Sequence, residues 1–436
     1  MNISDINKEI FRLAIPNIIS NITIPVLGMV DLAIMGHLDS PVYLDAIAIG
    51  GIIFSFMYAI FGFLRMGTSG FTAQYFGQKD EAKQIMILYR VLLLGIIGGI
   101  LLILFQKPIE WISFQWIGAS GEVSSFAKEY YRIRIFAAPA SLGILGLSGW
   151  FTGMQNTKSP MFIALIINIL NIIVSYVLVY HYGFRSEGVA WGTLIAQYAG
   201  LIAGLWIVYR KYNYLLIQKL KRSMWNWNEL SRFFRVNLDI IIRSLSLIFT
   251  FSFFTAQSSH FGDNILGVNS LLLQYLMFFS FFTDGFAYAA ESLTGKYCGA
   301  INIQKQKETS KAIFRIGWII AMVFASFYFL FGKEILYLMT DIQAIIQDSG
   351  EFLIWLAILP FSAIAAFIYD GIFIGATSSR PMRNTLLIAT FLVFLPAYYL
   401  FRNSLGNHSL WLALNLFMIV RSAGLWYFSK SLYPAA

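Results

Sequence analysis

The chain is poor in charge, in cysteine and in histidine, and each scarcity excludes a class of protein. Only 12% of its 436 residues are charged, about half the share of a typical soluble domain. The single cysteine, Cys298, has no partner in the chain for a disulfide or a zinc knuckle, so we expect an inert buried thiol. The sequence has no Walker loop and no HExxH or GxSxG motif. ATP-driven pumping by this chain alone and intramembrane metalloproteolysis therefore lack the residues they need.

What the chain has instead is apolar sequence, since 58% of its residues are hydrophobic. A helix that crosses a bilayer needs about 20 mostly apolar residues, and runs of that length fill most of the chain. We therefore predict an all-α membrane protein with twelve transmembrane helices. The first run is too long for a secretory signal, so we expect Met1 to be the mature start. The predicted spans lie near residues 11–37, 46–72, 85–106, 126–152, 161–181, 188–210, 234–260, 266–295, 312–332, 350–376, 384–401 and 408–429.

The basic residues are unevenly divided among the connections between these spans. The connections after even-numbered spans carry most of the lysines and arginines, whereas the first and seventh connections carry none. Basic loops remain on the cytoplasmic side of a membrane, so we predict a protein of the bacterial cytoplasmic (inner) membrane with both termini in the cytoplasm. The net charge of +9 then reflects topology, and we expect no nucleic-acid partner.

The most basic hydrophilic stretch, residues 211–232, lies near the middle of the chain. We predict that it is a cytoplasmic linker between an N-lobe of six spans (1–210) and a C-lobe of six spans (233–436). The halves resemble each other in sequence: TAQYFG at 72–77 matches TGKYCG at 294–299, an offset of 222, and Pro139 and Pro360 differ by 221. Secondary transporters with such repeats place their substrate sites within or between the repeats, near the bilayer midplane.

Four acidic residues fall inside predicted spans, where each costs about 2.5–3.5 kcal/mol on insertion scales and is a candidate functional residue. They are Asp31, Asp284, Glu291 and Asp370. Asp31 has no cation within one helical turn and shares its helix face with Asn17, Asn21 and Gly28. This pattern indicates a polar cavity in which Asp31 exchanges a proton. The alternative is that Asp31 lies near the outer interface and reaches water.

The span that contains Asp31 also contains Pro16 and Pro25. A proline removes a backbone hydrogen bond and kinks or breaks a helix, which a membrane tolerates where neighbours or water satisfy the freed carbonyl groups. Two interpretations follow. The prolines either fix a static kink or make a helix bend that changes the exposure of Asp31.

Other polar side chains recur at helical spacing. Asn168, Asn171 and Ser175 share one face of the fifth span, and Thr193 of the sixth is placed to join them; the alternative role is to hold the helices together by hydrogen bonds. The C-lobe faces comprise Arg243, Thr250 and Gln257 on the seventh span and Asp284, Tyr288 and Glu291 on the eighth. A buried arginine needs a carboxylate partner, for which Asp239 and Asp284 are candidates. These residues form either a structural ion pair or part of a substrate or coupling site.

Four long segments make the chain recognisable: residues 13–44, 63–77, 268–299 and 369–384, the last reading YDGIFIGATSSRPMRN. They resemble the DinF-like branch of the multidrug and toxic compound extrusion (MATE) family. The resemblance implies two six-helix bundles around a V-shaped central cleft and export of small organic compounds, often cationic or amphipathic, in exchange for H⁺ or Na⁺ by alternating access. It implies no cofactor and no enzymatic activity. We expect a monomer in the lipid bilayer.

The resemblance also assigns individual residues. Asp31 corresponds to the family's first-helix acid, and Pro16 to the proline at which that helix bends. Asn171 and Thr193 match polar positions of the N-lobe cation site, so these two residues and Asp31 are candidate Na⁺ ligands. Ser175 stands where the family usually has a second aspartate. Because a hydroxyl is a weaker cation ligand than a carboxylate, this departure makes Asp31 the main coupling carboxylate of the N-lobe.

Three alternative functions remain to be compared with export. A flippase of lipid-linked or other amphipathic substrates needs several arginines or lysines in its cavity to hold phosphates, and Arg243 is the main deep candidate. A membrane-embedded enzyme needs clustered histidines or a nucleophile with a base, but the four histidines lie at span ends or in loops. A passive channel is disfavoured by the two-lobed repeat.

Overall fold

The structure, a computed structural model, describes residues 3–38, 40–118, 121–218 and 227–432. Within these ranges every regular element is helical, and twelve helical stretches are long and apolar enough to cross a bilayer. The prediction of an all-α protein with twelve spans is confirmed. The spans are Asp5–Gly36, Pro41–Gly77, Glu81–Leu104, Gly121–Gly153, Lys158–His181, Ser186–Leu216, Trp227–Ser259, Asp263–Gly299, Ile303–Met339, Leu353–Gly375, Ser379–Leu405 and His408–Leu432.

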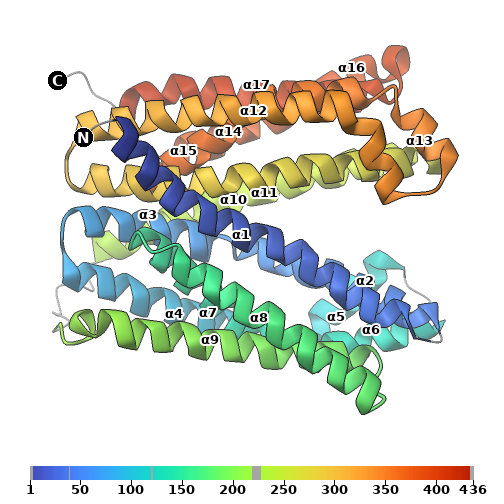
Figure 1. Ribbon diagram of the computed structural model, residues 1–436, viewed down its shortest axis with the longest axis horizontal. Coiled ribbons are helices and arrows are strands. Elements are labelled where there is room, and N and C mark those ends of the chain that lie inside the picture. Colours follow the sequence, from blue (N-terminus) through green and yellow to red (C-terminus); the bar gives the residue numbers. More distant parts are fainter. Residues whose placement is uncertain (1–2, 39, 119–120, 219–226, 433–436) are drawn as a thin grey trace. The chain divides into compact units, whose positions relative to one another are not determined.

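The helices follow one another with short connections (Figure 1). The α-helices are α1 (Ile3–Gly36), α2 (Pro41–Ile60), α3 (Phe63–Gly77), α4 (Glu81–Leu104), α5 (Gln106–Ile117), α6 (Gly121–Arg134), α7 (Ala138–Gly153), α8 (Lys158–Tyr176), α9 (Ser186–Leu216), α10 (Trp227–Ser259), α11 (Asp263–Gly299), α12 (Ile303–Met339), α13 (Gln343–Ser349), α14 (Leu353–Gly375), α15 (Ser379–Leu387), α16 (Leu395–Leu405) and α17 (His408–Ser429). Short 3₁₀ or π segments are η1 (Ile135–Ala137), η2 (Val177–His181), η4 (Ile388–Phe394) and η5 (Lys430–Leu432).

The chain folds as two compact units. The C-unit contains Met1–Ile18 and Ser231–Ala436, and the N-unit contains Ile19–Leu230. The boundary falls inside α1, so the first half of this helix belongs to the C-unit and the second half to the N-unit.

The predicted basic linker, residues 211–232, is helical at both of its ends. Residues 211–216 continue α9 past a kink at Tyr212, whose backbone has φ −128° and ψ 22°. Residues 227–232 form the first turns of α10. Residues 219–226, with the predicted cytoplasmic cations Lys219, Lys221 and Arg222, lie outside the described residues.

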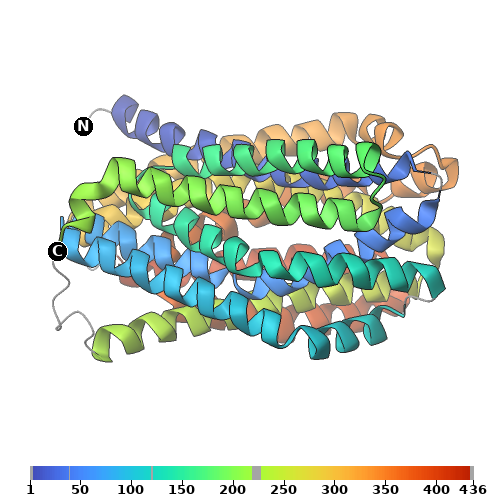
Figure 2. The same ribbon diagram turned by 90° about the horizontal axis from the view of Figure 1, so that it is seen from below.

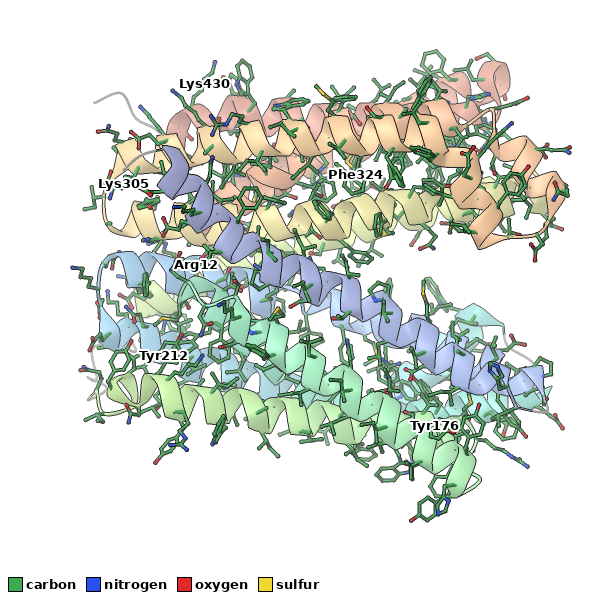
Figure 3. All side chains as sticks on the ribbon, in the orientation of Figure 1. Arg12, Tyr176, Tyr212, Lys305, Phe324 and Lys430 are labelled. Atoms are coloured by element: carbon green, nitrogen blue, oxygen red, sulfur yellow. The ribbon has the colours of Figure 1, made fainter. Side chains whose placement is uncertain are left out.

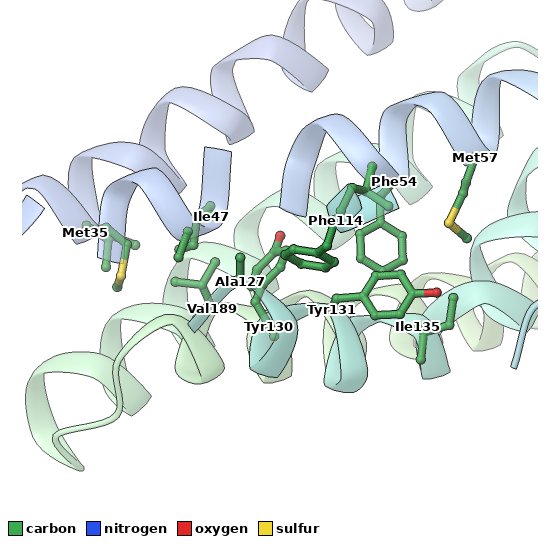
Figure 4. Packing of buried hydrophobic residues seen from close by; sticks show 14 of the residues in the cluster. Met35, Ile47, Phe54, Met57, Phe114, Ala127, Tyr130, Tyr131, Ile135 and Val189 are labelled. Carbon is green, nitrogen blue, oxygen red and sulfur yellow. The ribbon is translucent and has the colours of Figure 1, made fainter. Parts of the chain in front are cut away.

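The N-unit is built from paired helices. α8 and α9 run side by side, as two views show (Figures 1 and 2), while α7 packs against α3 and α4, and α2 packs against α6. The core between α2 and α6 is aromatic (Figure 4): Phe54 stacks on Tyr131 with ring centroids 5.5 Å apart and meets Tyr130 edge-on at 6.4 Å. Burying such large rings supplies much of the packing free energy of a unit of this kind.

The C-unit is centred on α14, which packs against α11, α12 and α17. The start of α1 is tied to α11, because Glu9 forms an ion pair with Lys296 at 2.5 Å and accepts a hydrogen bond from Tyr297 at 3.0 Å. Arg12, Lys305 and Lys430 all lie toward one end of this unit (Figure 3). The assignment of this end to the cytoplasmic side stays a prediction from the sequence.

The two units repeat the same local packing at an offset of 222 residues. A Cβ on Gly149 would lie 2.3 Å from the backbone oxygen of Arg65, and one on Gly371 would lie 2.1 Å from that of Ala287. The loop between two helices also repeats: Lys79 and Ile301 adopt φ 57° and 54°. One residue later, Asp80 and Asn302 each cap a helix by accepting a hydrogen bond of 3.0 Å, from Lys83 N and Lys305 N. The structure thus supports the duplication inferred from the sequence.

Several features depart from uninterrupted spans. The fourth span breaks at η1, between α6 and α7, because Pro139 cannot donate to the carbonyl of Ile135 and its ring crowds that oxygen. The short helices α5 and α13 were not predicted. α5 presents Trp116, which is 88% exposed, as is typical of aromatic side chains at a membrane interface.

Replacing Gly371 by alanine tests the close contact between α11 and α14. The added methyl group would meet backbone, which cannot move aside as a flexible side chain can, so we expect a loss of about 1–3 kcal/mol in stability. The matched control is Gly51→Ala, because a Cβ at Gly51 has nothing within 4 Å. Thermal unfolding of the purified protein in detergent should show a lower Tm for Gly371→Ala only. Equal Tm values for the two variants would contradict the packing described.

Candidate functional site

Asp31 lies on the N-unit part of α1, and its side chain is turned into the protein. The residue is 9% exposed, and within the described residues its Oδ1 atom has no hydrogen-bond partner. The polar face predicted for this span is partly buried, since Asn17 and Asn21 are buried while Gly28 is exposed. A buried carboxylate oxygen without a donor is costly, so this position holds an acid whose charge is poorly compensated by hydrogen bonds.

Arg134 is a cation in the core beside the α1 turn of Asp31, and the sequence analysis did not identify it. Ile34, one turn after Asp31, packs in the same core cluster as Tyr130, and no hydrogen bond among the described residues joins Asp31 to Arg134. Arg134 instead donates to Tyr130 Oη at 2.5 Å, and its guanidinium lies over the ring of Phe54, 4.7 Å from the centroid. The sequence does contain an indication of this residue, because a basic side chain far from both ends of a span is unusual. Arg134 lies 13 residues from the start and 19 residues from the end of its span.

Asn171, Ser175 and Thr193 form one buried cluster between α8 and α9. Asn171 Nδ2 donates to Thr193 Oγ1 at 2.9 Å, and Ser175 Oγ donates to Asn171 Oδ1 at 3.5 Å. Asn168, one turn before, is half-buried and donates to the carbonyl of Thr23 in α1 at 3.1 Å. The structure therefore brings together the polar residues of the fifth and sixth spans, although no hydrogen bond among the described residues links them to Asp31.

The donor set of the N-unit limits which cation it can hold. Amide and hydroxyl oxygens together with one carboxylate are acceptable Na⁺ ligands, but they bind a cation more weakly than paired carboxylates do. Within the described part of the chain, no group of three or more His, Cys, Asp or Glu side chains is placed to hold a metal ion. Asn171 and Thr193 are hydrogen-bonded to each other, but no contact among the described residues places Asp31 beside them, so a Na⁺ site shared by the three residues stays a prediction.

Asp370 is the centre of the ion-pair cluster of the C-unit. Its Oδ2 atom binds Arg243 of α10 and Arg421 of α17, the latter at 2.8 Å, and all three residues are buried. Asp239, considered as a partner for Arg243, was the wrong choice. Asp239 forms an ion pair with Arg383 at 2.5 Å and accepts from Ser379 at 2.7 Å.

Asp284 is half-buried, and its carboxylate contributes to the electrostatic field at Arg421. Glu291 lies two turns further along α11 and is fully buried, and Tyr288 between them is half-buried. Gln257 and Thr250 of α10 face the eleventh span: Gln257 Oε1 accepts from Tyr398, and the hydroxyls of Thr250 and Thr390 are 3.1 Å apart. The polar face of α10 is therefore a packing surface over most of its length.

Pro16 and Pro25 both lie within the continuous helix α1. Pro16 is buried and Pro25 is half-buried. The boundary between the two units falls between Ile18 and Ile19, one half-turn after Pro16. The proline thus lies next to the point at which α1 passes from one unit to the other.

An all-helical membrane protein with twelve spans, an internal repeat and charged clusters inside the spans has the features of a secondary transporter. Comparison with known proteins agrees. The MatE family model matches residues 16–177 and 240–400. The chain is 38% identical over 426 residues to "DNA damage-inducible protein F" of Escherichia coli K12, covering 96% of this chain and 91% of that protein. It is 23% identical to "Probable multidrug resistance protein NorM" of Thermotoga maritima, covering 88% and 81%.

Solved structures show the same fold. A multidrug resistance MATE family transporter of the MOP superfamily, in an outward-facing conformation, superposes with a TM-score of 0.88 at 22% identity, covering 98% of this chain and 96% of the other. A MOP superfamily transporter from Pyrococcus furiosus gives a TM-score of 0.88, covering 99% and 97%. The chain belongs to the MatE family of multidrug efflux transporters, and its relatives are transporters and not enzymes.

Removing the carboxylate of Asp370 tests the C-unit cluster. Asp370→Asn leaves two buried guanidinium groups without their shared counter-ion, and the loss of one partner from a buried ion pair costs about 3–5 kcal/mol. Arg421→Met should cost less, because Asp370 keeps Arg243. Tm in detergent should fall most for Asp370→Asn and less for Arg421→Met. The exposed Asp341 provides the control variant, Asp341→Asn, and a Tm loss as large in the control would refute the role of the cluster.

Proposed function

We propose that this protein is a secondary active exporter that exchanges small organic compounds, often cationic or amphipathic, for H⁺ by alternating access. The observation that carries the proposal is the buried carboxylate of Asp31, whose Oδ1 atom has no hydrogen-bond partner among the described residues. Such a group gains free energy by taking up either a proton or a cationic substrate. Because the carboxylate cannot bind a proton and a cationic substrate at the same time, uptake of the proton favours release of the substrate.

The choice of H⁺ over Na⁺ rests on the composition of the N-unit cluster. Ser175 supplies a hydroxyl where a second carboxylate would hold Na⁺ more firmly, and its oxygen is already engaged with Asn171. Na⁺ bound by Asp31, Asn171 and Thr193 is the weaker alternative. The bend expected at Pro16, with Pro25 as a second weak point, would change the access of Asp31 to either side.

The membrane setting of the proposal follows from the same features. Twelve apolar spans make the chain an integral membrane protein. We propose that it acts as a monomer in the bacterial cytoplasmic membrane with both termini in the cytoplasm, because most of the lysines and arginines of the connections follow even-numbered spans. Residues 1–210 and 233–436 would then form the two lobes, joined by the linker 211–232.

One observation favours a second candidate function. Arg243 and Arg421 bring two buried guanidinium groups to a single carboxylate in the C-unit, and paired guanidiniums bind phosphate well. A flippase of lipid-linked or other amphipathic substrates would use such a pair for the headgroup. Translocation of a fluorescent phospholipid between leaflets of proteoliposomes, abolished in Arg421→Met, would support this function over export.

The test of proton-coupled export uses proteoliposomes loaded with a fluorescent organic cation. Imposed pH and Na⁺ gradients are applied separately, and efflux is followed by fluorescence. Wild-type protein should export under the pH gradient, and Asp31→Asn should reduce the rate at least tenfold because the variant cannot exchange a proton. The control is Asp45→Asn, an exposed acid of α2. Export by Asp31→Asn at the wild-type rate would exclude the scheme.

Replacing Ser175 by aspartate tests the choice of coupling ion. A second carboxylate next to Asn171 should strengthen Na⁺ binding, so Na⁺-driven efflux should rise relative to H⁺-driven efflux. Gly192 lies directly against Ser175, so Ser175→Asn serves as the control of equal size without the charge. If the aspartate and asparagine variants respond equally to Na⁺, the hydroxyl at this position does not select the ion.

A further inference from the structure

Arg134 is held in the N-unit by aromatic residues. Its guanidinium lies 4.7 Å from the ring centroid of Phe54 in α2 and 5.4 Å from that of Tyr130 in α6, and it donates to Tyr130 Oη. Phe54 meets Tyr130 edge-on, with ring centroids 6.4 Å apart, and both rings lie in the core between the two helices (Figure 4). An arginine fixed in this way keeps its charge at one position instead of moving to the membrane surface.

The guanidinium keeps most of its hydrogen-bonding capacity. It has five N–H donors in a planar fork that matches a carboxylate or sulfonate, and its hydrogen bond to Tyr130 is the one it makes among the described residues. The residue is half-buried, so packing does not cover it completely. Arg132, two residues earlier, behaves differently, because it is exposed and forms an ion pair with Glu110 at 2.8 Å.

The turn of α1 that carries Asp31 lies against the core that holds Arg134. Ile34, one turn after Asp31, packs in one hydrophobic cluster with Phe54 and Tyr130, the two rings that contact the guanidinium. Asp31 is the acid on that turn. Its Oδ1 atom is buried without a hydrogen-bond partner among the described residues. An acid and a guanidinium thus lie around one core inside the spans, and no hydrogen bond among the described residues joins them, although contact between them would stabilise both strongly in a low-dielectric medium.

A substrate with two opposite charges would complete this arrangement. We propose that Arg134 and Asp31 form a two-point site for zwitterionic amphiphiles, in which the anionic group of the substrate binds Arg134 and its cationic group binds Asp31. The inference rests on the proposed export function and names the substrate class for that site. A proton on Asp31 leaves the site with the net positive charge of Arg134, which expels the cationic group of the substrate, as exchange for H⁺ requires.

Three probes that share one fluorescent alkyl body test the proposal: a sulfobetaine, a quaternary ammonium and a sulfonate. Their charges are fixed, so differences between them report the site. Binding to purified protein in nanodiscs at pH 7.5 requires no ion gradient. Wild-type protein should bind the sulfobetaine about tenfold more tightly than the ammonium probe, the value expected for one charge-assisted hydrogen bond.

The variants separate the two charges. Arg134→Gln should remove the advantage of the sulfobetaine and leave ammonium binding equal or stronger, whereas Arg134→Lys should retain part of it. Asp31→Asn should weaken both the sulfobetaine and the ammonium probe. Arg132→Gln, on the same helix but exposed, should bind all three probes as wild type does. An unchanged order of affinities in Arg134→Gln overturns the proposal.

Two further readouts complete the test. If Arg134→Gln fails to fold, the affinities of the wild-type protein still test the proposal. Tighter binding of the ammonium probe than of the sulfobetaine would contradict a two-point site. Transport in proteoliposomes is scored separately. Loss of the sulfobetaine advantage without any gradient-driven export would support the site and reject the exporter. Normal export together with an unchanged order of affinities in Arg134→Gln would support the exporter and reject the two-point site.

Discussion

An ionised side chain inside a bilayer must find its compensation within the protein, and the two units of this chain meet that requirement differently. In the C-unit, Asp370 is bound directly by Arg243 and Arg421, so its charge is neutralised by contact. In the N-unit, no hydrogen bond among the described residues joins Asp31 to Arg134, and Asp31 Oδ1 is buried without a partner there. Close pairing stabilises a single arrangement of the charged side chains. An incompletely paired charge, in contrast, is stabilised further when it binds a proton or a substrate. The N-unit is therefore the better place for exchange chemistry.

Much of the fold could be predicted because the bilayer imposes a simple rule on sequence. Every span needs about 20 apolar residues whose backbone hydrogen bonds are made within the helix, so a hydropathy reading locates all twelve. The duplication was also detectable, because close packing restricts residue choice. Gly149 and Gly371 have backbone of a neighbouring helix where a side chain would be, which explains why short motifs survive at a fixed offset.

The partners of buried charges could not be predicted from the sequence. Helical periodicity shows which residues share a face but not which helix that face meets. Asp239 and Asp284 were the candidate partners of Arg243, yet Arg243 binds Asp370, which is 127 residues away and is shared with Arg421. The cluster of Asn171, Ser175 and Thr193 was easier to predict, because α8 and α9 are consecutive and therefore adjacent.

The position of Arg134 shows how the two halves have diverged while keeping one backbone plan. Arg134 lies five residues before Pro139, and Trp355 lies five residues before Pro360. Likewise Ser148 precedes Gly149 where Asp370 precedes Gly371. The glycine and the proline are repeated at these positions, but Arg134 and Asp370 have no charged counterpart in the other half. Because packing fixes the backbone and leaves the identity of many polar side chains open, one half of the chain can acquire a closed ion-pair cluster while the other retains an incompletely paired acid and base.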